Sequence, residues 1–169
     1  MSASQRDPAK VDDVRGLIAP TVLGNLLLPA AAVAEVVSYS GSDVRPHQGG
    51  SQWLVTDLEW LGQWVPLVDL GPAAPDDIQD KPVIGTRRRR PCALVCFTPN
   101  GNPAVPYIAI LTTDSPRLVR LTSADLAQAP NTRTIPLAHF TLDYRGSPAW
   151  VPDLDLIERE ALLRAPPTT

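Results

Sequence analysis

One segment of this chain occurs twice, and this repeat constrains the fold more than any other feature. Residues Leu58–Leu70 and Leu142–Leu156 share one order: apolar, acidic, aromatic, any residue and Gly, then Val-Pro, and finally Asp-Leu. The second copy has two extra residues between the glycine and Val-Pro. Each copy is typical of a strand, a glycine turn and a returning strand. The repeat therefore predicts a mostly β chain that is built from two similar halves.

The composition excludes several classes of protein. With 169 residues, 44% of them hydrophobic and 20% charged, the chain is typical of a globular protein. Its net charge of −3 gives no reason to expect general nucleic-acid binding. No apolar run is long enough to span a bilayer, and residues 1–8 lack the apolar core of a secretory signal. Together with the presence of only two cysteines, these features predict a cytoplasmic protein.

Polar and proline-rich segments predict how the chain is divided. We expect a flexible N-terminal tail at residues 1–13 and a single folded domain at residues 14–165. Within this domain, the two repeat halves are expected at residues 14–70 and 92–158, and the linker between them at residues 71–91. A helix is expected near the end of the domain, because Asp155 and Glu158 have the spacing of a capping box. Pro166 would end this helix.

Alternation along residues 53–60 predicts a strand with two unlike faces. Leu58 and Trp60 fall on one face, whereas Asp57 and Glu59 fall on the other and mark it as solvated. Two carboxylates on one strand could act as acid and base in a hydrolase. We favour a solvated strand edge instead, because nothing else in the sequence resembles a sugar-binding cleft.

Four side chains in the sequence could bind zinc, namely Cys92, Cys96, His47 and His139. Their spacing lacks the short paired intervals of structural zinc sites. Cys92 and Cys96 fall on one face of a predicted strand, too far apart for a disulfide with each other. We therefore expect two buried structural cysteines and no metal.

The linker contains an unbroken cationic run, Arg87–Arg90, which could bind phosphate or an acidic partner. A solvated loop is the more ordinary interpretation, because aspartates lie nearby and the loop lacks interleaved aromatic residues. No Ser-His-Asp set, phosphate-binding glycine loop or metalloprotease motif is present. The sequence therefore favours a protein without catalytic activity.

The order of several short motifs resembles the CheW-like family. Asn25–Pro29 is followed by Val33–Val36, then by a loop, by the Gly62 turn and by Val65–Leu70, which reads Val-Pro-Leu-Val-Asp-Leu. In that family a Val-x-Glu-Val element precedes a glycine hairpin of the form Asn-x-Arg-Gly and a Val-x-Pro-Val-Val-Asp-Leu strand. The resemblance is best over the first repeat half and continues, more weakly, over the second.

This resemblance implies a fold and a function. The implied fold is all-β, with two intertwined five-stranded SH3-like barrels around a shared hydrophobic core, short helices and a C-terminal helix. The implied function is that of a non-catalytic scaffold that needs no cofactor. Members of the family couple chemoreceptors to a chemotaxis-type histidine kinase, whose regulatory domain is itself CheW-like.

The chain departs from the family at the first hairpin. Glu59–Gly62 stands where the family has Asn-x-Arg-Gly, so that Leu61 replaces the arginine, and the family's earlier glycine falls at Thr56. Short, divergent chains of this kind resemble the accessory ChpC-type adaptors of type IV pilus chemosensory systems. That resemblance implies a role in controlling twitching motility.

The resemblance and the two hairpin turns together predict a partner-binding site, which consists of Val33, Glu35, Thr56, Leu61, Gly62, Arg145 and Gly146. The expected partners are the regulatory domain of the kinase and the cytoplasmic tip of chemoreceptors, and neither nucleic acid nor direct membrane insertion is expected. The implied location is the cytoplasm, with recruitment to inner-membrane chemosensory arrays. We expect no catalytic residue, metal or cofactor. The main alternative is a small β-barrel nucleic-acid-binding protein that would use Arg87–Arg90.

Overall fold

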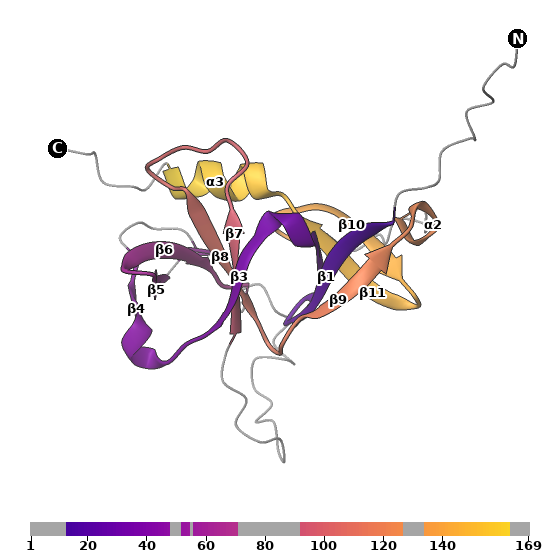
Figure 1. The fold of residues 1–169 in the computed structure, drawn as a ribbon, viewed down its shortest axis with the longest axis horizontal. Coiled ribbons are helices and arrows are strands. Elements are labelled where there is room, and N and C mark those ends of the chain that lie inside the picture. Colours follow the sequence, from indigo (N-terminus) through magenta and orange to yellow (C-terminus); the bar gives the residue numbers. More distant parts are fainter. Residues whose placement is uncertain (1–12, 48–51, 55, 71–91, 127–133, 163–169) are drawn as a thin grey trace, which may run out of the picture.

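The computed structural model describes residues 13–47, 52–54, 56–70, 92–126 and 134–162 (Figure 1). Almost all of the expected N-terminal tail, and the whole expected linker with its arginine run, lie outside these described residues.

The described residues are mostly β, as the sequence predicts. The strands are β1 (Val14–Thr21), β2 (Gly24–Pro29), β3 (Val33–Ser38), β4 (Val44–Pro46), β5 (Thr56–Trp60), β6 (Gln63–Val68), β7 (Cys92–Phe97), β8 (Tyr107–Thr112), β9 (Arg117–Leu121), β10 (Ala138–Tyr144) and β11 (Ser147–Pro152). Helices are short and comprise two 3-10 turns at Ala30–Ala32 and Gly41–Asp43, α2 (Ser123–Leu126) and α3 (Leu154–Leu162).

The strands form two sheets, and each sheet takes strands from both repeat halves. A five-stranded sheet has the order β10-β11-β2-β1-β9, and a six-stranded sheet has the order β3-β7-β8-β6-β5-β4. The short β4 is the sixth strand, in a segment whose composition suggests only a loop. In Figure 1 the six-stranded sheet lies on the left, the five-stranded sheet on the right, and α3 runs above them. The halves of the sequence are therefore interleaved.

Strands β2 and β7 each face the core shared by both sheets and a core within their own sheet. They are therefore buried on both faces, which explains their continuous apolar runs. Leu26 and Leu28 of β2 point into a core shared by both sheets, whereas Leu27 points into a core within the five-stranded sheet. On β7, Leu94 belongs to the shared core and Val95 to a core within the six-stranded sheet. Alternate side chains of one strand thus serve two cores, as the two-residue period of a strand requires.

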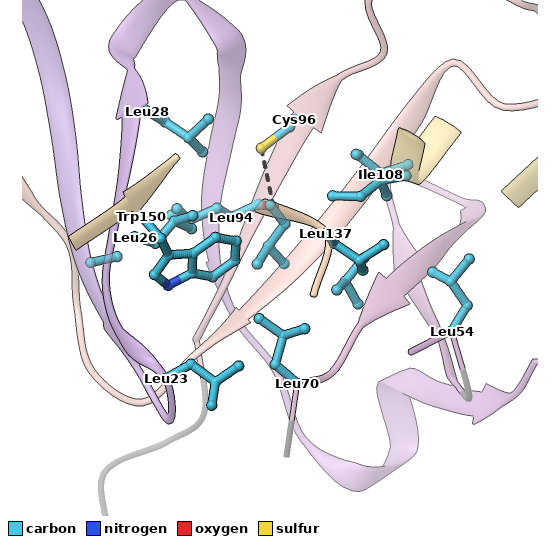
Figure 2. Close-up of a cluster of buried hydrophobic side chains, with 14 of the residues drawn as sticks. Leu23, Leu26, Leu28, Leu54, Leu70, Leu94, Cys96, Ile108, Leu137 and Trp150 are labelled. Carbon is cyan, nitrogen blue, oxygen red and sulfur yellow. Dashed lines mark hydrogen bonds between the residues drawn. The ribbon is translucent and has the colours of Figure 1, made fainter. Parts of the chain in front are cut away.

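Trp150 of β11 is the largest fully buried side chain of the shared core (Figure 2). Its indole Nε1 donates a hydrogen bond to Thr21 Oγ1 at 3.2 Å, so that its polar atom has a partner. Leu94 and Ile108 from the other sheet and Ile157 from α3 belong to the same cluster. The core predicted between two β subdomains is therefore present.

The repeat corresponds to two hairpins with the same turn. Leu61 and Gly62 join β5 to β6 with φ of 50° and 75°, and Arg145 and Gly146 join β10 to β11 with φ of 50° and 80°. Positive φ at both central residues is the geometry that matches the twist of a two-residue hairpin. The prediction of two glycine hairpins is confirmed.

The downstream parts of the two copies differ. Val65 and Pro66 lie in the middle of β6, but Pro152 is the last residue of β11. Asp153 then caps α3, because its Oδ1 accepts a hydrogen bond from the backbone N–H of Leu156 at 2.9 Å. The expected cap at Asp155 is therefore wrong by two residues.

Glu158, the expected partner in that capping box, has a different role. It is fully buried on α3, and its Oε2 accepts hydrogen bonds from the backbone N–H and the side-chain amide of Asn100, at 3.1 and 3.0 Å. This carboxylate ties α3 to the loop that joins β7 to β8. The helix is thereby fixed to the six-stranded sheet as well as to the shared core.

Candidate functional site

Glu35 owes its orientation to a β-bulge in β3. Val33 pairs with Cys96, but Glu35 pairs with Val95, so that one extra residue lies between them on β3. A bulge of this kind changes the face on which the following side chains lie. Glu35 consequently shares a face with Val37, which packs in the core of the six-stranded sheet, yet Glu35 itself is exposed at the end of that core.

Trp60 closes the end of this core from the opposite side. Its indole Nε1 donates a hydrogen bond to Glu35 Oε2 at 2.8 Å, although β3 and β5 are not neighbours in the sheet. The ring of Trp60 meets the ring of Tyr107 edge to face at 4.8 Å between centroids. Tyr107 in turn lies 5.6 Å from the ring of Phe97, its cross-strand partner on β7. Four side chains from four strands therefore form one continuous surface.

Leu61 follows Trp60 in the chain and stands at the hairpin tip. Its side chain is 78% exposed, and its φ of 50° is one that Leu adopts only at a cost of about 1–2 kcal/mol. Gly62 beside it has no heavy atom of the described residues within 4 Å of its Cβ position. We call Glu35, Trp60, Leu61, Phe97 and Tyr107 the tip patch.

The tip patch is mostly apolar and has one carboxylate. Phe97 is 47% exposed, although aromatic rings of this size are usually more deeply buried. Exposed apolar groups that are contiguous, rather than scattered, mark surfaces at which proteins bind one another. The geometry therefore fits a protein-binding surface with an apolar centre and an acidic rim.

Two other predicted site residues are half-buried and do not belong to the tip patch. Val33 is half-buried and packs against the shared core, so that only part of its side chain is exposed. Thr56 is half-buried at the opposite end of β5 from Leu61, about 13 Å along the strand from Trp60. The structure therefore brings Glu35, Leu61 and Gly62 together, but not Thr56.

Arg145 and Gly146 lie on the other sheet. Their hairpin and the Leu61 hairpin are on opposite sides of the molecule in Figure 1. Arg145 forms an ion pair with Asp125, with 3.8 Å between Nε and Oδ1, and its guanidinium lies 5.1 Å from the ring centroid of Tyr144. The residues predicted as one site are therefore divided between two surfaces.

The expectation of a solvated Asp57 is wrong. Asp57 is 7% exposed, because Arg45 and His47 from the β4 region cover it. Arg45 Nε donates a hydrogen bond to Oδ2 at 3.1 Å, and His47 Nδ1 lies within hydrogen-bond distance of Oδ1. Glu59 remains exposed. Because both oxygens of Asp57 are occupied, the two carboxylates do not face a common substrate as a hydrolase would require.

The cysteines are buried, as the sequence predicts. Cys96 lies in the shared core, and this burial raises the pKa of its thiol to about 12. Cys92 is also buried, within 3.7 Å of Ser38 Oγ and far from His47 in the sheet order. Among the described residues, no cluster of three or more His, Cys, Asp or Glu side chains is arranged to bind a metal ion.

Two members of the tip patch, Phe97 and Tyr107, have no direct signal in the sequence. Phe97 and Tyr107 are cross-strand partners on either side of a turn that the sequence predicts. The contact of Tyr107 with Trp60, however, depends on how the sheet curls. An aromatic residue at each end of one predicted hairpin is the signal that could have indicated them.

One of the comparisons with known proteins bears on the fold. No protein-family model matches the sequence, and no curated protein matches it. None of the described helices has the length and apolar character that crossing a membrane requires. The structure is similar to the crystal structure of the scaffolding protein TtCheW from Thermoanaerobacter tengcongensis, with a TM-score of 0.58 and 10% identity over 90% of each chain. The fold of this chain is therefore CheW-like.

Proposed function

We propose that this protein is a non-catalytic signalling adaptor that binds the regulatory domain of a chemotaxis-type histidine kinase through the tip patch. The CheW-like fold, shared with a scaffolding protein, supports the class of function. The observation that carries the assignment of the surface is the strained, exposed Leu61 beside the Glu35–Trp60 hydrogen bond. A residue held in an unfavourable conformation at an exposed tip is expected at a site of recognition.

The chemistry of the tip patch defines the surface that it would bind. Leu61 supplies an apolar contact where the family has a cation, so that the partner should offer a dry pocket at that point. One carboxylate oxygen of Glu35 accepts the hydrogen bond from the Trp60 indole, and the negative charge of this exposed side chain remains accessible to a partner. A cation on the partner beside an apolar pocket would complement both groups.

Replacement of Leu61 by Asp is the decisive test. Leu61→Asp should weaken binding of the purified kinase regulatory domain by about 2 kcal/mol or more in isothermal titration calorimetry, because a charge would enter a dry contact. Phe140→Asp is the matched control, since Phe140 is 42% exposed on β10 of the other sheet. Normal binding by Leu61→Asp would reject the tip patch, and no binding by the unaltered protein would reject the adaptor itself.

Glu35 gives a second and more graded test. Glu35→Lys reverses the charge and removes the acceptor of the Trp60 indole, so that both the rim and the tip should be disturbed. Glu35→Gln keeps an acceptor oxygen and removes only the charge. If the charge matters, both variants weaken binding. If only the hydrogen bond matters, Glu35→Gln binds normally.

The proposal extends to a place in the cell. We infer a cytoplasmic adaptor that reaches inner-membrane arrays through chemoreceptor tips and acts in a type IV pilus system. The basis is the resemblance of this short, divergent chain to accessory adaptors of such systems. Titration with a soluble receptor tip fragment tests the second partner, and loss of twitching on deletion of the gene tests the pathway. Twitching that is unchanged would reject the pilus assignment and leave kinase binding intact.

A further inference from the structure

A groove lies on the five-stranded sheet beside the second hairpin. Its volume is about 310 Å³, which is near the lower end for sites that bind small molecules. Arg117 and Leu118 of β9 line one wall, Asn25 of β2 lines another, and the hairpin contributes Tyr144 and Arg145. The groove therefore combines cations, an amide and an apolar wall.

The cations of this groove are only partly neutralised. No ion pair forms between Arg117 and a carboxylate of the described residues, and the partner of Arg145, Asp125, is 3.8 Å away. Two hydrogen bonds from Thr122 lower the pKa of Asp125, so that its charge is already stabilised without the arginine. An exposed ion pair of this length contributes little to stability, so that Arg145 is available to another anion.

A buried hydroxyl adds a second, independent observation. Tyr144 lines the groove and is 5% exposed, yet its hydroxyl has no hydrogen-bond partner among the described residues. A buried polar group without a partner destabilises a protein, and such groups are rare in native structures. Because this oxygen is itself buried, a ligand oxygen would gain the hydrogen bond that the free protein lacks only through a local shift of the groove side chains.

We propose that this groove binds an oxyanion, a carboxylate or phosphate, that is carried beside an apolar group. The guanidinium groups of Arg117 and Arg145 bind the anion, because a guanidinium matches the geometry of both oxyanions. Leu118, which is exposed, contacts the apolar neighbour, and Tyr144 donates its hydroxyl hydrogen to the anion once ligand binding uncovers that buried hydroxyl. This site is separate from the tip patch and does not depend on the proposed function.

Two probes distinguish a free anion from an acidic side chain of a peptide. The first is inorganic phosphate, and the second is the peptide acetyl-Leu-Glu-Leu-amide, compared with acetyl-Leu-Gln-Leu-amide. Each is titrated into the ¹⁵N-labelled protein, and chemical shifts of the groove residues are followed by NMR. Saturable shifts with phosphate alone identify a free anion as the source. Shifts with the Glu peptide that the Gln peptide does not reproduce identify an acidic side chain.

Variants test the roles of individual residues. Arg117→Ala and Arg145→Asn should each weaken binding of the active probe about tenfold, because each removes a charged hydrogen-bond donor. Asn is chosen at residue 145 because it tolerates the positive φ of the turn. Arg120→Ala is the matched control, since Arg120 lies on the same strand but outside the groove, where it pairs with Asp13.

Tyr144→Phe separates binding from folding. It should weaken probe binding and leave the thermal stability of the free protein unchanged or raised, because it deletes a hydroxyl without a partner. The proposal is overturned if neither probe shifts the groove residues. It is also overturned if Arg117→Ala and Arg145→Asn bind the active probe as well as Arg120→Ala does.

Discussion

The two hairpin tips have nearly the same backbone but opposite chemistry. Leu61 and Arg145 both adopt a φ of 50°, and each is followed by a glycine with positive φ. Leu61 is an exposed apolar residue next to an aromatic cluster, whereas Arg145 is a cation paired with Asp125. The turn fixes the backbone at both sites and leaves the first side chain of each turn free to differ.

This difference shows how a repeated element can supply two unlike surfaces. Asn, Asp and Gly are the residues that favour the first position of such a turn, and neither tip has one of them. Each tip therefore carries a side chain that is poor for the turn. We interpret both as binding residues, because both side chains are exposed and their backbone conformation lowers stability.

The largest effect on stability is expected when the chain is divided into two fragments that carry one hairpin tip each. Residues 1–80 and 81–169, expressed apart, should each fail to unfold cooperatively, because each sheet requires strands from both pieces. Circular dichroism and urea unfolding of the two fragments measure this. A sharp transition from either fragment alone would show that one half, with its own hairpin, is an independent unit.

Replacement of the aromatic residue before each tip should lower the free energy of unfolding by a smaller amount. The loss should differ between the two tips. Tyr144→Ala should lower the free energy of unfolding by about 3–5 kcal/mol, because Tyr144 is buried in the core of the five-stranded sheet. Trp60→Ala should cost about 1–2 kcal/mol, because Trp60 is only half-buried. Urea unfolding of both variants tests the contrast, and equal losses would mean that the two tips are supported alike.

The glycines of the two turns should behave identically. Gly62→Ala and Gly146→Ala should each lower the free energy of unfolding by about 1 kcal/mol or more, because Ala resists positive φ. Among the described residues, no heavy atom lies within 4 Å of either Cβ position, so that a clash with them would not contribute. A large difference between the two variants in thermal unfolding would show that the turns are not equivalent.

The smallest effect is a gain in stability. Leu61→Asn and Arg145→Asn should each raise the free energy of unfolding by about 0.5–1 kcal/mol, because Asn adopts positive φ more readily. Leu61→Asn should at the same time weaken kinase binding, whereas Arg145→Asn should not. Thermal unfolding and calorimetry on the same preparations check both statements. A loss of stability in either variant would contradict the interpretation of strain.

The sequence predicted features that depend on local spacing. A glycine at a fixed distance after an aromatic residue predicted the positions of both hairpins. Runs of apolar residues predicted the strands that are buried on two faces, such as β2 and β7. These signals come from backbone conformation and from the two-residue period, which neighbouring residues determine.

Features that depend on distant pairing were not predictable. Asp57 reads as solvated, and only its pairing with β4 shows that Arg45 and His47 cover it. The Glu35–Trp60 hydrogen bond likewise joins strands that are not neighbours in the sheet. The period of a strand does not say which strand lies beside it, so that the division of the predicted site between two surfaces could not be foreseen.

The interleaving of the strands also sets an order in time during synthesis. The hydrogen bond between Thr21 and Trp150 spans 129 residues, and β2 lies unpaired on one side until β11 has left the ribosome. The six-stranded sheet, by contrast, needs no strand beyond β8. All strands around the apolar tip at Leu61 therefore leave the ribosome before the cationic tip does, and the apolar residues of β2 must be kept from aggregating during that interval.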